Sequence, residues 1–210
     1  MLRKKLPIYL LIALLATGLS PLYGLFDVQA GVGIAGLSYI DDASAAASGK
    51  FVDTSLQALT FGFAGHVHTM EQDVICIGIG PYVVAGPGMR YSGDAGGTNV
   101  AFSSSQFMIG GEVYGKILAT KVIFPYVKFG YGYDRLSTRI NLGASSAETK
   151  LNGSGYRILA GIEIPLTPLI GVFVEGGSTE SSFSVSGVNV SGDKAKGGGY
   201  VFTTGLSASF

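Results

Sequence analysis

The 210-residue chain has no tryptophan, a single cysteine and no net charge. One cysteine, Cys76, excludes an intramolecular disulfide framework. Zero net charge means that no basic excess is present to neutralise phosphates, so we expect no nucleic-acid partner. Charged residues make up only 13% of the chain, against a usual share of roughly 25%. So few charges cannot cover the wet surface of an ordinary soluble domain.

Long apolar runs are also missing, except at the N-terminus. A basic stretch, MLRKK, precedes the short apolar core LPIYLLIALLATG, and turn-forming residues follow up to Gly24. This order is typical of a secretory signal peptide that is cleaved after export. The alternative is a permanent helical anchor, but Gly18, Pro21 and Gly24 make its second half a poor helix. We therefore predict a signal peptide over residues 1–24 and one mature domain over residues 25–210.

The mature region is rich in glycine and in alternating patterns. Glycine accounts for 33 of the 210 residues, about twice its usual share of roughly 7%. Apolar or aromatic residues recur at every second position, which is the period of a β-strand. Eight runs have this pattern: residues 26–34, 59–68, 74–86, 107–117, 126–134, 156–164, 170–177 and 200–210. Each run predicts a strand with one apolar face and one small or polar face.

The connections between these runs alternate between short and long. Short links follow the second, fourth and sixth runs, and polar stretches follow the others, at residues 41–50, 87–105, 135–153 and 179–197. A spanning strand needs roughly 9–11 residues, so the chain can supply eight spanning strands. Short turns at one end and long loops at the other are the layout of an outer-membrane barrel. We predict an all-β fold, an eight-stranded antiparallel up-and-down transmembrane β-barrel.

A soluble lipocalin would have the same number of strands, but it would need a polar exterior. The positions of the lysine, arginine and glutamate residues do not provide one. The apolar alternates are therefore expected to face lipid rather than a core, and backbone pairing around a closed barrel leaves no strand edge in the bilayer.

The alternation and the aromatic C-terminus resemble the small eight-stranded outer-membrane proteins of the OmpA, OmpX and OmpW kind. The last run places Tyr200, Phe202, Leu206 and Phe210 on one face. In that family a final strand ending in phenylalanine is similar to the signal read by the barrel-assembly machinery. The resemblance implies that these four residues are an assembly signal and that this machinery is a partner. It also implies an outer-membrane location, with outer-membrane lipid around the barrel.

Four charged residues fall on the inward faces of consecutive runs: Glu112, Lys128, Arg157 and Glu175. Each lies about six to eight residues from its short turn, which at ~3.3 Å per residue places all four at a similar height. An eight-stranded lumen is narrow enough to be filled by side chains, and buried charges need partners. We predict a charge-neutral network that closes the lumen. The alternative is a gate or a weak ion path.

Further polar residues are predicted to face the same lumen: His66, His68, Lys116, Asp134 and Glu163. The two histidines and Cys76 are potential zinc ligands, with His68 expected across from Cys76. A structural zinc site usually needs four ligands, so we expect no metal and no cofactor. Catalysis by a nucleophile and a base also lacks support, because both histidines face inward. We therefore expect no enzymatic activity.

Two classes of function remain. The first is a structural or surface-exposed barrel whose polar stretches at residues 41–50, 87–105, 135–153 and 179–197 contact host molecules or other partners. The second is a narrow channel for small hydrophobic solutes, as the resemblance to OmpW implies. Charged pairs at mid-height disfavour an apolar path, so the sequence favours the first class.

Overall fold

The computed structural model describes residues 25–40, 56–71, 74–87, 90–95, 98–118, 122–142, 145–184 and 194–210. The predicted signal peptide, residues 1–24, and the predicted loop 41–50 lie outside them. The described strands are β1 Phe26–Ile40, β2 Leu56–Glu71, β3 Ile75–Gly86, β4 Arg90–Ala95, β5 Thr98–Ile117, β6 Phe124–Leu142, β7 Ser145–Pro165, β8 Ile170–Ser184 and β9 Lys194–Ser209. Within the described residues, no helix is long and apolar enough to cross a membrane.

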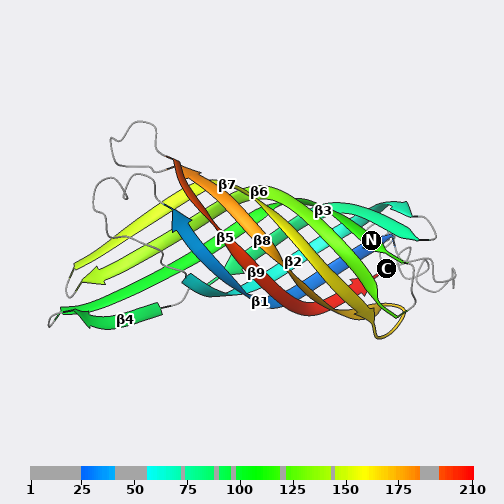
Figure 1. Ribbon diagram of the computed structural model, residues 1–210, viewed down its shortest axis with the longest axis horizontal. Coiled ribbons are helices and arrows are strands. Elements are labelled where there is room, and N and C mark those ends of the chain that lie inside the picture. Colours follow the sequence, from blue (N-terminus) through cyan, green and yellow to red (C-terminus); the bar gives the residue numbers. More distant parts are fainter. Residues whose placement is uncertain are drawn as a thin grey trace, which may run out of the picture.

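Eight of the strands close into an antiparallel barrel (Figure 1). Each barrel strand pairs with the next along the chain, β3 pairs with β5, and β9 pairs with β1. Two backbone hydrogen bonds between Phe26 and Phe210, of 3.0 and 2.8 Å, join the first and last strands where the chain ends. The short strand β4 pairs with β5 beyond the closed ring. The predicted eight-stranded fold is confirmed.

The two faces of the barrel strands differ as the alternation predicts. On β6, Val127, Phe129 and Tyr131 are exposed on the outside, whereas Lys128 between them is buried. The same holds on β9, where Leu206 is 59% exposed and the neighbouring Ser207 is buried. Such exposed apolar side chains occur on all eight barrel strands, and an apolar surface of this extent is not tolerated on a soluble monomer. This outer band is the surface that a bilayer solvates.

In three of the four stretches predicted as polar loops, most of the described residues are in strands. Residues 87–105 contain β4 and the start of β5, residues 135–153 are the paired ends of β6 and β7, and residues 179–197 include the ends of β8 and β9. Figure 1 shows β5, β6 and β7 extending past the other strands at the end opposite the C-terminus, which we call the outer end. The loop prediction was wrong because apolar alternation reports only a difference between two faces. Beyond the lipid-facing band this difference reverses: the inward residues Leu136 and Phe183 are apolar and buried, while backbone pairing continues.

Candidate functional site

The inward faces of the strands meet in a lumen filled by polar and aromatic side chains. Tyr82 and Tyr114 are fully buried there. Within the described residues, the buried charged side chains are Asp27, Glu112, Lys116, Lys128, Asp134, Arg157, Glu163 and Glu175. Because buried charges are costly without partners, the contacts of these groups determine what the lumen can do.

Glu112 on β5 and Arg157 on β7 form the first ion pair. Arg157 donates from Nε to Glu112 Oε2 at 3.0 Å and makes a second contact through Nη2. On the other side, His66 Nε2 lies 2.8 Å from Glu112 Oε1. The guanidinium stacks over the Tyr82 ring, 3.7 Å from its centroid, and the His66 ring stacks on Tyr114 at 4.7 Å. Both carboxylate oxygens are engaged, and the cation is further stabilised by an aromatic face.

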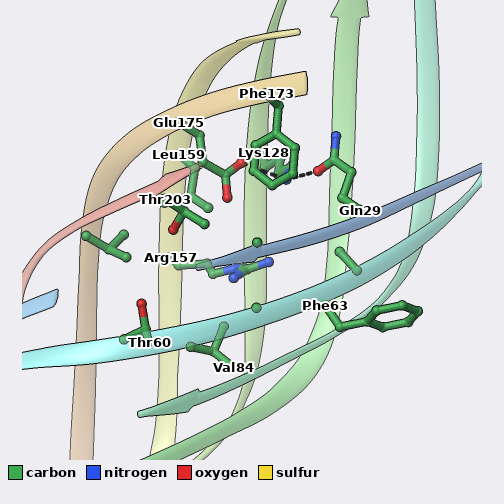
Figure 2. Close-up of a pocket in the computed structure, with 14 residues that line it drawn as sticks. Gln29, Thr60, Phe63, Val84, Lys128, Arg157, Leu159, Phe173, Glu175 and Thr203 are labelled. Carbon is green, nitrogen blue, oxygen red and sulfur yellow. Dashed lines mark hydrogen bonds and ion pairs between the residues drawn. The ribbon is translucent and has the colours of Figure 1, made fainter. Parts of the chain in front are cut away.

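Lys128 on β6 and Glu175 on β8 form the second pair, with 2.7 Å between Nζ and Oε2. Lys128 also donates to Gln29 Oε1 on β1, and the Tyr126 hydroxyl donates to Glu175 Oε2 at 3.0 Å. Figure 2 shows the Lys128 ammonium between the Glu175 carboxylate and the Gln29 amide. This group therefore cross-links strands from opposite sides of the lumen.

Glycines on intervening strands make these contacts possible. Gly130 on β6 is the Cα partner of both Glu112 and Arg157, so these two residues face each other across a strand that carries no side chain there. A Cβ at Gly130 would lie 3.0 Å from Arg157 Cγ. Gly161 has the same position between Tyr126 and Glu175. Because the intervening strand has only glycine at these positions, side chains from the two strands that flank it can reach each other and form hydrogen bonds.

Lys116 forms a third group nearer the short turns. Its Nζ lies 3.0 Å from Asp27 Oδ2 and 2.9 Å from Glu163 Oε2, so one cation serves two carboxylates. The alternation of residues 26–34 placed Asp27 inward, but no sequence signal indicated its partner, because 89 residues separate it from Lys116.

Asp134 lies in a fourth group, toward the outer end. It accepts hydrogen bonds from Gln106 Nε2 at 2.8 Å and from Ser181 Oγ at 2.6 Å, both neutral donors. The described lumen thus holds five buried carboxylates and three buried cations. The four residues predicted as one network lie in two separate pairs, which are neutral by themselves, within a wider set that is acidic.

A small cavity remains beside the second pair. Its volume is about 30 Å³, which is enough for about two water molecules. The polar residues that line it are Gln29, Thr60, Lys128, Arg157, Glu175 and Thr203 (Figure 2). Apolar residues line the rest of it, among them Phe63, Val84 and Leu159, so the lining is part charged and part apolar.

His68 does not lie across from Cys76 as predicted. The Cα partner of His68 is Gly78, and that of Cys76 is Glu71, because β2 stays paired as far as Glu71 and the turn comes later in the chain than predicted. The register also shifts by one residue between His68 and Met70. A bulge of this kind adds one residue to one strand and displaces every later pair. Among the described side chains, no group of three or more histidine, cysteine, aspartate or glutamate residues is arranged to hold a metal ion.

Cys76 packs with Leu118 and Phe124, and its exposed fraction is zero. We expect a maleimide reagent to modify the folded barrel at least about a hundredfold more slowly than the unfolded chain, because labelling then requires an opening of the structure. The measurement is the mass increase over time with and without denaturant. Equal rates in the two states would contradict the burial of this thiol.

The four C-terminal residues predicted as an assembly signal share the outward face of the last strand. Tyr200, Phe202, Leu206 and Phe210 are about half exposed there. In this position they belong to the lipid-facing band, and their role in assembly stays a prediction.

Comparisons with known proteins identify the fold. No protein-family model matches the chain, and no curated protein matches it. Among solved structures, Neisserial surface protein A is 16% identical, with 90% of this chain and 99% of that chain covered at a TM-score of 0.50. The outer-membrane protease OmpT from Escherichia coli is 10% identical, with 91% and 98% covered at 0.52. The attachment invasion locus protein Ail of Yersinia pestis is 10% identical, with 88% and 98% covered at 0.47.

Identities this low show the fold alone. A closed antiparallel barrel with an apolar outer band and short turns at one end is the architecture of outer-membrane proteins. The chain therefore has the fold of the small outer-membrane β-barrels and spans that membrane.

Proposed function

We propose that this protein is a closed outer-membrane barrel whose function lies at the cell surface. The observation that carries the proposal is the pair of cross-lumen groups, Arg157 with Glu112 and Lys128 with Glu175. They occupy the middle of a lumen that eight strands leave only wide enough for side chains. With the lumen closed, the described parts of the chain that are able to meet a host or other surface ligand are the strand ends beyond the membrane.

The extended β6–β7 hairpin is the best candidate for such contacts. Its strands remain paired up to Leu142 and Ser145, and side-chain hydrogen bonds reinforce them, including Tyr133 to Asn152 at 2.7 Å. A preorganised surface loses less conformational entropy on binding than a flexible loop does. The predicted loop at residues 41–50 lies outside the described residues.

A non-enzymatic role agrees with the environment of the buried histidine. His66 is 1% exposed and engaged by Glu112 and Tyr114, so it is not available as a base toward an external substrate. One of the similar structures is titled a protease, and that activity is a property of that protein. We further propose that Tyr200, Phe202, Leu206 and Phe210 are read by the barrel-assembly machinery.

Single-channel conductance in planar bilayers tests the closed lumen. We expect no steady conductance from the wild-type protein and leakage from Glu112→Ala and Lys128→Ala, since each removes part of the filling and one partner of an ion pair. Lys128→Ala also lowers stability, so Gln29→Ala, which removes a neutral side chain beside the same cavity, is a second opening variant. Lys196→Ala, at an exposed position near the outer end of β9, is the control and should stay closed.

Steady wild-type conductance would contradict closure and favour the second candidate, a narrow channel. The cavity beside Lys128 and Glu175 is the observation that favours it. Three charged side chains, Lys128, Arg157 and Glu175, lie in its lining, and the described lumen carries an excess of carboxylates. We therefore expect such a channel to pass small cations more readily than hydrophobic solutes. Ion selectivity, measured from the reversal potential in a salt gradient, separates these two kinds of path.

A further inference from the structure

Three exposed cations lie on the outward face of the β6–β7 hairpin, and we call them the basic ladder: Arg135, Arg139 and Lys150. Arg135 and Arg139 continue the outward row of β6 that holds Tyr131 and Tyr133, and β7 adds Lys150 to the same face. The side chains of Arg139 and Lys150 are 57% and 51% exposed. The ladder has no role in the lumen or in the hairpin's backbone pairing.

The ladder begins where the lipid-facing band ends. From Pro125 to Tyr133 the outward row of β6 runs roughly 26 Å at ~3.3 Å per residue. A strand tilt of about 40° reduces this to roughly 20 Å across a bilayer whose apolar band is about 25 Å tall. Tyr131 and Tyr133 therefore mark the outer aromatic girdle. The next outward position, Arg135, lies at the level of the lipid head groups.

Glu148 holds two of the cations side by side. Its carboxylate lies 2.8 Å from Arg139 Nη2 and 3.0 Å from Lys150 Nζ. Hydrogen bonds from Arg139, and then from Lys150, lower the pKa of Glu148 to about 2. The Glu148 carboxylate therefore stays ionised at any pH near neutrality. The other acid beside this face is Glu180, which accepts a hydrogen bond from Tyr156 at 2.5 Å. Arg135 makes no ion pair within the described residues, and the face keeps an excess of positive charge.

We infer that the basic ladder binds the phosphate head group of a lipid in the outer leaflet. Guanidinium groups bind phosphate through two parallel N–H donors, and the lysine adds a point charge. The lipid's acyl chains would lie along Phe129 and Tyr131, directly below the ladder. A free phosphate ion would contact the cations alone, and isolated contacts at an exposed surface contribute little. Continuity with the lipid-facing band therefore favours the lipid.

The test compares the wild-type protein with the triple variant Arg135→Gln/Arg139→Gln/Lys150→Gln in nanodiscs of phosphatidylcholine with added phosphatidic acid. Bound phosphatidic acid is counted by native mass spectrometry after release of the barrel. We expect the triple variant to retain about tenfold less of it, because each juxtamembrane cation strengthens the binding of anionic lipid and Glu148 offsets part of this attraction. Arg135→Lys, which keeps the charge but loses the two-donor fork, should lose only part of the binding.

Lys196→Gln removes an exposed cation at the outer end of β9, outside the ladder, and should bind as the wild type does. Gel mobility without heating verifies that every variant is folded. Equal retention by the triple variant and the wild type would overturn the inference. So would full displacement of the lipid by inorganic phosphate, which would identify a site for the free anion instead. Neither result depends on whether the lumen conducts, so the closed-lumen proposal is tested separately.

Discussion

Lys128→Met is expected to lower the free energy of unfolding by about 3–5 kcal/mol, the usual cost of removing one partner from a buried ion pair. Methionine keeps most of the side-chain volume but has no ammonium group. Glu175 would then be a buried carboxylate whose remaining donor in this group is the Tyr126 hydroxyl, and Gln29 Oε1 would lose its donor. The cost arises from the uncompensated charge rather than from a cavity.

The double variant Lys128→Met/Glu175→Gln should recover most of that loss, because it removes both charges. Denaturant unfolding in phospholipid vesicles, followed by tyrosine fluorescence and by gel mobility, measures the free energy of unfolding. It is applied to the wild type, to the two single variants Lys128→Met and Glu175→Gln, and to the double variant. Lys196→Met, at an exposed position, is the matched control and should change stability by less than about 0.5 kcal/mol. If the double variant were as unstable as the two single losses added together, the pair would not be energetically coupled.

Gly80→Ala is expected to destabilise the barrel by about 3 kcal/mol, at the upper end of the usual cost of overpacking. A Cβ at Gly80 would lie 1.7 Å from the carbonyl oxygen of Gly65. Backbone cannot turn aside as a flexible side chain does, so the β2–β3 pairing itself must separate. The contact is set by main chain on both sides, which explains why glycine is needed at this inward position.

Gly111→Ala on the adjacent strand is the control. The nearest atom to a Cβ there is 3.9 Å away, and alanine loses less backbone entropy than glycine on folding, so this change should be neutral or stabilising by about 0.5 kcal/mol. The measurement is the fraction folded against urea, with Cys76 labelling as an independent report of opening. Equal stability of the two variants would show that β2 and β3 can separate locally at little cost.

The strands and the direction of their side chains were predictable because alternation is a local property. On β6, the pattern around Lys128 and Phe129 alone assigns one residue to the lumen and the other to lipid, and burial agrees with both assignments. The outer strand ends were not predictable in this way. Around Arg139 the apolar residues lie on the opposite face from those in the lipid-facing band, because Leu136, Ile140 and Leu142 alternate with the polar residues. A strand that continues past the lipid therefore does not keep the pattern by which it was recognised.

The lumen contacts were predictable only in part. Counting residues from the turns places the four mid-height charges together, but it does not say which of them pair. In the structure Glu112 meets Arg157 across Gly130, and Lys116 reaches Asp27 from a distant part of the chain. These contacts depend on the stagger between neighbouring strands, on the β2–β3 bulge and on the positions at which glycine places no side chain in the lumen.

By itself, the sequence determined that this chain closes into a barrel, which of its residues meet lipid and which are enclosed. Those outcomes follow from the two-residue period of a strand and from the scarcity of charge. Only the tertiary structure decided which enclosed groups become partners and where the outer cations lie relative to the membrane. The physical reason is that register and tilt are properties of the whole closed sheet, and a shift of one residue in any strand exchanges its two faces.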